Sequence, residues 1–240
     1  MNVKKFCSLI KEKKFIKAIM NHQVAAGTEH LSVFRELSQK KIRTIVDIGA
    51  NRGQFALVAR NNFPDAVIFS FEPLAKAANI FKKLFLKDSR VILNEFALGP
   101  ETREMKIHIS NADDSSSLLP ISQLQNSLYK GTFEKATTTV QVKPLDEVLN
   151  PSDIIQPAFL KIDVQGYEKE VLLGCSSLLH LFQFVYVECS FVELYEGQSL
   201  AHEVIEFLSQ SGFILSGVYN MSYDKKGLAI QGDFLFTRKS

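Results

Sequence analysis

The fold expected of this chain follows from one stretch, Val46-Asp47-Ile48-Gly49-Ala50-Asn51-Arg52-Gly53. The stretch completes the β-rich run 44–48, and a helical pattern begins directly after it at Gln54. Glycine at these positions permits a tight turn and a close approach of a ligand to the backbone. The helix N-terminus that follows offers free N–H groups to an anion. We therefore expect a strand, a glycine turn and a helix that together bind an anionic group.

Beyond this stretch, apolar runs typical of strands alternate with amphipathic runs typical of helices. This alternation predicts parallel β-α-β units with helices on both faces of the sheet. The right-handed crossover rule then favours a doubly wound open sheet. A turn-like Asp224-Lys225-Lys226-Gly227 predicts that the last strand runs antiparallel. We expect strands at 44–48, 66–71, 91–96, 158–164, 184–189, 213–219 and 232–237, and helices at 54–62, 74–86, 167–173 and 199–210.

One segment interrupts the alternation, and we interpret it as an insertion at about residues 101–143. Met105–Ile109 and Thr138–Val142 both alternate like strands, which predicts an antiparallel hairpin. The polar stretch between them includes Asp113-Asp114-Ser115-Ser116-Ser117, and such long connections are usually functional or disordered. The expected organisation is a helical extension at residues 1–42 followed by one α/β domain at 43–240.

The extension begins with a basic amphipathic pattern. Its apolar positions can share one helix face, and lysines crowd the other faces. Such a helix could make weak peripheral contact with an anionic membrane, but we favour packing of its apolar stripe on the main domain. The apolar positions are Phe6, Leu9, Ile10, Ile16 and Ile19.

Composition restricts location and partners. No apolar run is long enough to span a bilayer, and lysines interrupt the N-terminal apolar positions that a signal peptide would need. The three cysteines form no CxxC pair, which favours reduced thiols in a cytoplasmic protein. A net charge of +2 gives no reason to expect nucleic acid as a partner. The sequence leaves the oligomeric state open.

Four acidic residues fall at expected strand ends, namely Asp47, Glu72, Asp163 and Glu188. Ligands of open α/β sheets bind outside the carboxyl ends of the strands. A carboxylate inside an apolar strand is costly unless it is paired or solvated. Any one of these acids could simply cap a loop, but four at one edge predict a shared polar cleft.

Glu72 points to an adenosine-bearing ligand, because it ends the second strand about twenty positions after the glycine turn. Its oxygens can accept hydrogen bonds from both ribose hydroxyls and would repel a 2′-phosphate. NADP is therefore disfavoured, while NAD and S-adenosylmethionine stay open. The absence of GxGxxG spacing in the turn argues against a dinucleotide. Glu72 could also cap the helix after Pro73, and the two roles are compatible. We expect Asp47 and Asp163 to receive the ammonium of S-adenosylmethionine, either directly or through water, and 94–97 to flank its adenine.

Several motifs together resemble the FkbM-type methyltransferases from about Arg43 to the C-terminus. The resemblance implies a class I methyltransferase fold, S-adenosylmethionine as cofactor, and O-methylation of a hydroxyl, often on a sugar, glycan or secondary metabolite. The motifs are Val46–Gly53, Phe71-Glu72-Pro73, Ala97-Leu98-Gly99, Ser115-Ser116-Ser117-Leu118, Leu160-Lys161-Ile162-Asp163-Val164-Gln165-Gly166-Tyr167-Glu168 and Val187-Glu188.

The resemblance and the strand-end positions define the expected cofactor site. Position 165 is Gln where many relatives have Glu, which puts a direct acid role there in doubt. The expected cofactor-binding residues are Asp47, Gly49, Ala50, Asn51, Gly53, Glu72, Pro73, Asn94, Phe96, Ala97, Ser117 and Asp163.

Methyl transfer to a hydroxyl requires alignment of the acceptor oxygen and removal of its proton. We expect Asp163 and Glu188 to be the catalytic carboxylates. Tyr195 and His108 are candidates for the acceptor site, although Tyr195 could equally be a packed aromatic. Lys161 either forms a structural ion pair or orients Asp163. No spacing of histidines and acids marks a metal site.

The leading interpretation is an O-methyltransferase acting on a small-molecule or glycan hydroxyl. An NAD-linked oxidoreductase could use the same sheet. A noncatalytic binding module on a methyltransferase scaffold could use the long polar insertion as its contact surface.

Overall fold

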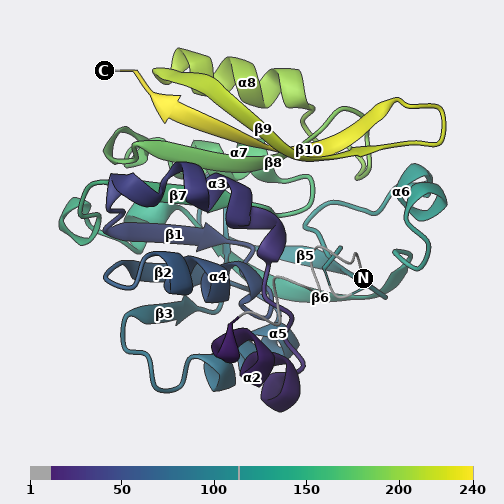
Figure 1. Cartoon of the computed structure of the whole chain (residues 1–240). Coiled ribbons are helices and arrows are strands. Elements are labelled where there is room, and N and C mark those ends of the chain that lie inside the picture. The colour runs from purple at the N-terminus through teal and green to yellow at the C-terminus, as the bar shows by residue number, and fades with distance from the viewer. Residues whose placement is uncertain (1–11, 113, 240) are drawn as a thin grey trace.

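The computed structural model describes residues 12–112 and 114–239, and a mixed sheet of seven strands forms its centre (Figure 1). The strand order is β3-β2-β1-β7-β8-β10-β9, and the first five of these strands run parallel. β10 runs antiparallel to both β8 and β9, which confirms the expected doubly wound sheet with an antiparallel last strand. The strands are β1 (Thr44–Ile48), β2 (Val67–Phe71), β3 (Val91–Asn94), β7 (Ala158–Ile162), β8 (Phe184–Ser190), β9 (Phe213–Tyr223) and β10 (Ala229–Arg238).

Helices cover both faces of this sheet. Residues of α2 to α5 pack in one core cluster and residues of α7 and α8 in another, because alternate side chains of the buried strands point to opposite faces. Ile45 and Phe159 thus belong to the first cluster, while Val46 and Leu160 belong to the second. The helices are α2 (Lys13–His22), α3 (Leu31–Glu36), α4 (Gln54–Asn62), α5 (Ala75–Leu84), α7 (Glu168–Gly174) and α8 (Ala201–Gln210).

The insertion forms a second sheet of three strands in the order β4-β6-β5. The expected hairpin is confirmed by antiparallel pairing of β5 (Arg103–Ser110) with β6 (Glu134–Lys143). β4 (Ala97–Leu98) pairs with β6, so the expected strand 91–96 is too long: the chain leaves the main sheet after Asn94. The second sheet and α6 (Gln123–Leu128) lie beyond the carboxyl ends of the parallel strands (Figure 1).

The described part of the N-terminal extension packs on the main domain. Phe15 and Ala18 of α2 are buried in the same cluster as Phe34 of α3 and Phe159 of β7. The expected stripe was misplaced, however, because Ile16 is half-buried and Ile19 is 38% exposed. The remaining positions of that stripe, Phe6, Leu9 and Ile10, lie outside the described residues.

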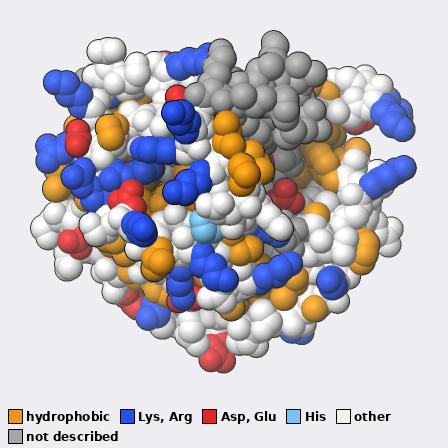
Figure 2. Space-filling model, turned by 60° about the horizontal axis from the view of Figure 1, so that its bottom comes forward, with side chains coloured by type: hydrophobic (Ala, Val, Ile, Leu, Met, Phe, Trp, Pro, Cys, Tyr) orange, Lys and Arg blue, Asp and Glu red, His pale blue; other side chains and the backbone are white. Residues whose placement is uncertain are grey.

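The lysines of α2 face solvent. Lys13, Lys14 and Lys17 are all exposed, as the amphipathic pattern predicted. Figure 2, in which the lower side of Figure 1 comes forward, shows many Lys and Arg side chains interspersed with apolar ones. Among the described helices, none is both long enough and apolar enough to cross a membrane.

Candidate active site

A cavity of about 710 Å³ lies where the parallel strands end and the insertion begins. Its size is within the range of small-molecule sites. Its wall combines the glycine turn, the residues after β2 and β7, and the polar stretch of the insertion. Of the residues expected at the site, the wall includes Gly49, Ala50, Asn51, Glu72, Pro73, Ala97, Ser117, Asp163 and Glu188.

The glycine turn holds the ends of β1 and β7 together. Gly49 has φ +76°, and a Cβ there would lie 1.8 Å from the carbonyl oxygen of Asp163. Only glycine fits such a contact. The backbone amides of Gly49 and Ala50 both donate to the carbonyl of Phe71, at 3.1 and 3.0 Å. These two amides are therefore engaged with β2 and do not point at a ligand anion, contrary to the simplest expectation for the turn.

Glu72 ties the turn to the chain after β2. Its Oε2 accepts from the backbone N–H of Asn51 at 2.9 Å and its Oε1 from that of Leu74 at 2.7 Å. Burial raises the pKa of the Glu72 carboxyl to about 7, although both amides oppose the shift. Each carboxylate oxygen has two acceptor sites, so Glu72 still has capacity for ribose hydroxyls. The expected N-cap role is wrong, because α5 begins at Ala75 with Leu74 as its N-cap, whereas the ribose role stays a prediction.

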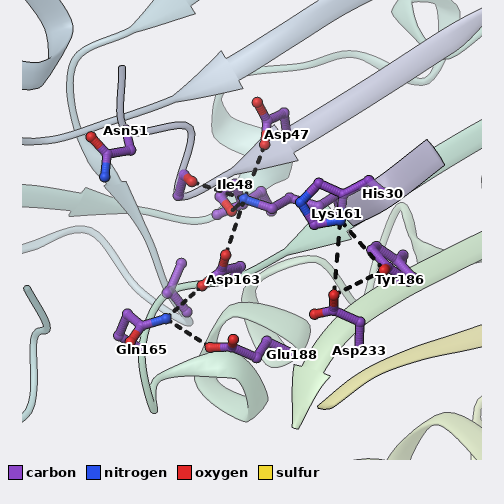
Figure 3. A network of polar contacts seen from close by, with 12 residues as sticks. His30, Asp47, Ile48, Asn51, Lys161, Asp163, Gln165, Tyr186, Glu188 and Asp233 are labelled. Atoms are coloured by element: carbon purple, nitrogen blue, oxygen red, sulfur yellow. Dashed lines mark hydrogen bonds and ion pairs between the residues drawn. The ribbon is translucent and has the colours of Figure 1, made fainter. Parts of the chain in front are cut away.

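Asp47 and Lys161 form a buried ion pair between β1 and β7. Their Cα atoms are register partners, so both side chains point to the same face of the sheet. Lys161 Nζ lies 3.2 Å from Asp47 Oδ1 and 3.8 Å from Asp163 Oδ2, and it donates to the carbonyls of Ile48 and Gly49 (Figure 3). Burial opposes the charge of Lys161, but the two carboxylates outweigh it and raise its pKa.

This geometry corrects the expectation for Asp47. The Asp47 side chain is fully buried and does not line the cavity. Its partner is Lys161, so it cannot receive a ligand ammonium directly. The structural ion pair expected of Lys161 is confirmed, and its ammonium also lies 3.8 Å from Asp163 Oδ2, so the orienting role stays a prediction.

Gln165 joins the two expected catalytic carboxylates. Its Nε2 donates to Asp163 Oδ1 at 2.8 Å and to Glu188 Oε2 at 2.7 Å (Figure 3). Its Oε1 accepts from the Tyr195 hydroxyl at 2.8 Å. The backbone at Gln165 has φ +59°, and Ser117 Oγ holds it by donating to its carbonyl at 2.6 Å. The amide therefore keeps two carboxylates close together in the cavity wall.

Glu188 lies in a strongly acidic environment. Burial raises the pKa of its carboxyl well above the usual range, and the charges of Asp163, Asp233 and Glu168 add to the shift. Gln231 Nε2 donates to Glu188 Oε1 at 2.9 Å. A carboxylate with a raised pKa is a better proton acceptor, which suits general-base chemistry.

Four further expected residues lie away from the cavity wall. A Cβ on Gly53 would meet Phe85 and Phe81, so this glycine serves packing against α5 rather than ligand contact. Asn94 Nδ2 donates to the carbonyl of Ser70, and the ring of Phe96 packs edge-on against Phe71. The imidazole Nδ1 of His108 lies 2.6 Å from Glu134 Oε2 on the insertion. Phe71 lines the cavity, so Phe96 supports the wall from behind.

Tyr195 is buried, with 2% of its surface exposed. Its hydroxyl contacts Gln165, Gln125 and the carbonyl of Ser115. Tyr195 does not line the cavity. It is a packed aromatic whose hydroxyl contacts polar groups of the cavity wall, so any effect on the acceptor would pass through those groups.

Sequence reasoning missed several wall residues because they carry no motif. His30, from the N-terminal extension, lines the cavity, and its Nδ1 lies 3.8 Å from Asp233 Oδ2. Gln54 of α4 also lines it, and its Oε1 is buried with no hydrogen-bond partner among the described residues. From the insertion and β10 come Gln125, Tyr129, Thr132 and Gln231. No pattern marks these positions, since the insertion's path decides which side chains meet.

The arrangement fits an adenosyl and amino-acid ligand. Glu72 offers acceptors for a ribose, and the buried Gln54 Oε1 and Asp163 offer acceptors for an ammonium. Arg52, on the glycine turn, brings positive charge to the wall. Within residues 12–112 and 114–239, no group of His, Cys, Asp and Glu side chains is arranged to hold a metal ion.

Comparison with known proteins assigns the family. The model of the methyltransferase FkbM domain matches residues 47–215. The chain belongs to the FkbM methyltransferase family. It is 30% identical over 190 residues to the 2-O-methyltransferase NoeI of Sinorhizobium fredii, covering 75% of this chain and 78% of NoeI. It is 27% identical over 143 residues to the hexuronic acid methyltransferase AglP of Haloferax volcanii, covering 59% and 54% of the two chains.

Solved structures agree on the fold. A Klebsiella pneumoniae protein described as an O-methyltransferase superposes with a TM-score of 0.52 at 16% identity, over 98% of this chain and 96% of that one. This FkbM-family protein thus has the class I methyltransferase fold, with the three-stranded sheet as an addition. Membership of a methyltransferase family counts against the alternative of an NAD-linked oxidoreductase.

Proposed function

We propose that this protein transfers a methyl group from S-adenosylmethionine to a hydroxyl oxygen of a sugar, glycan or secondary metabolite. The observation that carries the proposal is the pair of carboxylates, Asp163 and Glu188, joined by one amide in the wall that also contains the glycine turn. One relative is named for 2-O-methyl transfer and another for hexuronic acid methylation, which supports an oxygen acceptor on a sugar.

Each part of the cofactor is bound by different residues of the wall. Glu72 accepts the ribose hydroxyls, and Gln54 Oε1 with Asp163 accepts the ammonium. Arg52 attracts the carboxylate. Ala97 flanks the adenine. When bound, S-adenosylmethionine supplies a methyl group on a positively charged sulfur, and the product is S-adenosylhomocysteine.

The two carboxylates handle the proton of the acceptor. As the hydroxyl oxygen forms its bond to the methyl carbon, its proton passes to Asp163 or Glu188. Gln165 fixes the carboxylates, and Lys161 Nζ, 3.8 Å from Asp163, limits how far Asp163 can turn. Alignment of this kind is a major source of rate in displacement reactions.

The proposal is tested by methyl transfer from labelled S-adenosylmethionine to a panel of glycosides and hydroxylated metabolites, with the product position read by NMR. The expected product carries a new O-methyl group. Methylation at nitrogen or carbon alone would refute the oxygen acceptor. Cofactor binding without transfer to any member of the panel would favour a noncatalytic binding module.

A further inference from the structure

The insertion places one buried amide oxygen in the cavity wall without a partner. Gln125 of α6 is 3% exposed and lines the cavity. Its Oε1 is buried and has no hydrogen-bond partner among the described residues. A buried polar atom left unpaired destabilises the protein, so such atoms beside a binding cavity mark places where a ligand donates a hydrogen bond.

A series of hydrogen bonds determines which atom of the Gln125 amide, the oxygen or the nitrogen, has no hydrogen-bond partner. Gln165 presents its NH₂ group to the carboxyl oxygens of Asp163 and Glu188 and its oxygen to the Tyr195 hydroxyl, since the reversed amide would place its oxygen against both carboxyl groups. The Tyr195 hydroxyl then donates, since its other neighbour on that side, 3.2 Å away, is the carbonyl of Ser115.

The lone pair of Tyr195 consequently faces Gln125, whose Nε2 donates to it at 3.3 Å. Reversing the Gln125 amide would place two acceptors against each other. Each hydrogen bond in this series is therefore donated in the direction from α6 toward the carboxylates, and Gln125 Oε1 is left as a buried, unpaired acceptor on a residue that lines the cavity. Only a ligand group that carries a hydrogen, such as a hydroxyl, satisfies it.

The charges around Gln125 restrict the ligand further. In the described wall, the insertion and β8 contribute the carboxylates of Asp114 and Glu188 and no lysine or arginine. The basic wall residues are Arg52 on the glycine turn and Lys161, which Asp47 and Asp163 hold. A ligand carboxylate beside Gln125 would meet the like charges of Asp114 and Glu188.

We propose that Gln125 is a specificity-determining residue whose Oε1 accepts a hydrogen bond from a second hydroxyl of the acceptor, and that this acceptor is an uncharged polyhydroxyl unit such as a neutral glycosyl residue. This inference rests on the proposed O-methyltransferase function. The methylated hydroxyl lies at Asp163 and Glu188, and the second hydroxyl of the same molecule lies at Gln125. A uronate binds more weakly than its neutral counterpart.

The test measures binding of methyl glycosides to protein saturated with S-adenosylhomocysteine. The probes are the neutral glycosides of glucose, galactose, mannose, fucose and rhamnose, and the uronates of the first three. The variant is Gln125→Leu, and its matched control is Gln123→Leu, the same change at an exposed position of the same helix. Gln125→Asn replaces Gln125→Leu if the latter does not bind S-adenosylhomocysteine.

At least one neutral glycoside should bind the wild type more tightly than its uronate does. Gln125→Leu should weaken it about five- to tenfold, as expected for one lost hydrogen bond, while Gln123→Leu should not change it. The deoxy analogue that lacks the hydroxyl bound by Gln125 should bind the wild type about five- to tenfold more weakly than the parent glycoside does. The same deoxy analogue should bind Gln125→Leu as tightly as the parent glycoside does.

Additive losses, tighter binding of the uronates, or no binding of any neutral glycoside would overturn the inference. Failure of the wild type to bind S-adenosylhomocysteine would instead count against the proposed function. The two failures are therefore separate observations.

Discussion

At the scale of single residues, Asp163 contacts the glycine turn, the buried lysine and the amide that joins the two carboxylates. Asp163 follows β7 directly, and its backbone carbonyl oxygen lies so close to Gly49 that a Cβ there would clash with it. Its side chain lies between Lys161 and Gln165. A carboxylate that is held on two sides is already oriented before the substrate binds, so substrate binding need not supply the free energy to orient it. Such a group can receive a proton at the moment the acceptor oxygen reacts.

Replacing Asp163 with Asn should therefore preserve the fold and lower kcat by about a hundredfold or more, the range for a lost general base. Circular dichroism and thermal unfolding check the fold, and steady-state methyl transfer at saturating S-adenosylmethionine measures kcat. Asp65→Asn is the control, since the Asp65 side chain is 88% exposed. Wild-type turnover in Asp163→Asn would exclude an essential role for this carboxylate.

Single residues also show how far the site could be predicted from sequence. Glu72, Asp163 and Glu188 could be placed because strand ends meet at one edge of a sheet. Asp47 occupies the same kind of position but is buried, because the register of β1 with β7 pairs it with Lys161. Neighbours across strands depend on register, and one sequence does not reveal that pairing. Gln125 lay beyond prediction, because no periodicity fixes the path of the insertion.

At the scale of elements, the turn between β1 and α4 depends on one close contact. Both Gly49 and Gly197 have φ +76°, but a Cβ on Gly49 would meet the Asp163 carbonyl while a Cβ on Gly197 would meet nothing within 4 Å. The two glycines therefore separate the cost of backbone conformation from the cost of the contact between β1 and β7.

Gly197→Ala should lower the free energy of unfolding by about 1–2 kcal/mol, the cost of a left-handed residue with a Cβ. Gly49→Ala should cost more than about 3 kcal/mol, since the turn must also move away from Asp163. Urea denaturation of both variants measures the difference. Equal losses would show that the contact between Gly49 and Asp163 does not constrain the fold.

At the scale of the whole molecule, the described part of the N-terminal extension is built into the core and the cavity. Phe34 of α3 packs against Phe55, Phe63 and Phe159, and His30 contributes to the cavity wall. The alternating pattern after residue 43 was sufficient to predict the main sheet, whereas the extension's role was not visible. Its contacts are long-range, and a short helix has no signal that says which face of a sheet it covers.

Phe34→Ala should lower the free energy of unfolding by about 3–5 kcal/mol, as for a buried aromatic. Met20→Ala is the control, because Met20 is 77% exposed and its replacement should change stability by less than about 0.5 kcal/mol. Thermal and urea unfolding measure both. A negligible effect of Phe34→Ala would mean that the extension is not part of the folded core.

The central claim is that the cavity holds S-adenosylmethionine, with its ribose on Glu72. Ionised Glu72 accepts the ribose hydroxyls, and burial raises its pKa to about 7. Affinity should therefore be greatest above pH 7 and fall by up to about tenfold per pH unit as Glu72 takes up a proton below it. Glu72→Gln cannot ionise, so it should bind more weakly and without this dependence.

Calorimetric titration with S-adenosylhomocysteine across this pH range tests the claim most directly. The account predicts one site in the wild type whose affinity declines below about pH 7, and a weaker, pH-independent site in Glu72→Gln. Absence of binding to the wild type above pH 7 would contradict the claim that the cavity holds the cofactor. Equal affinity of the wild type and Glu72→Gln would show that Glu72 does not bind the ribose.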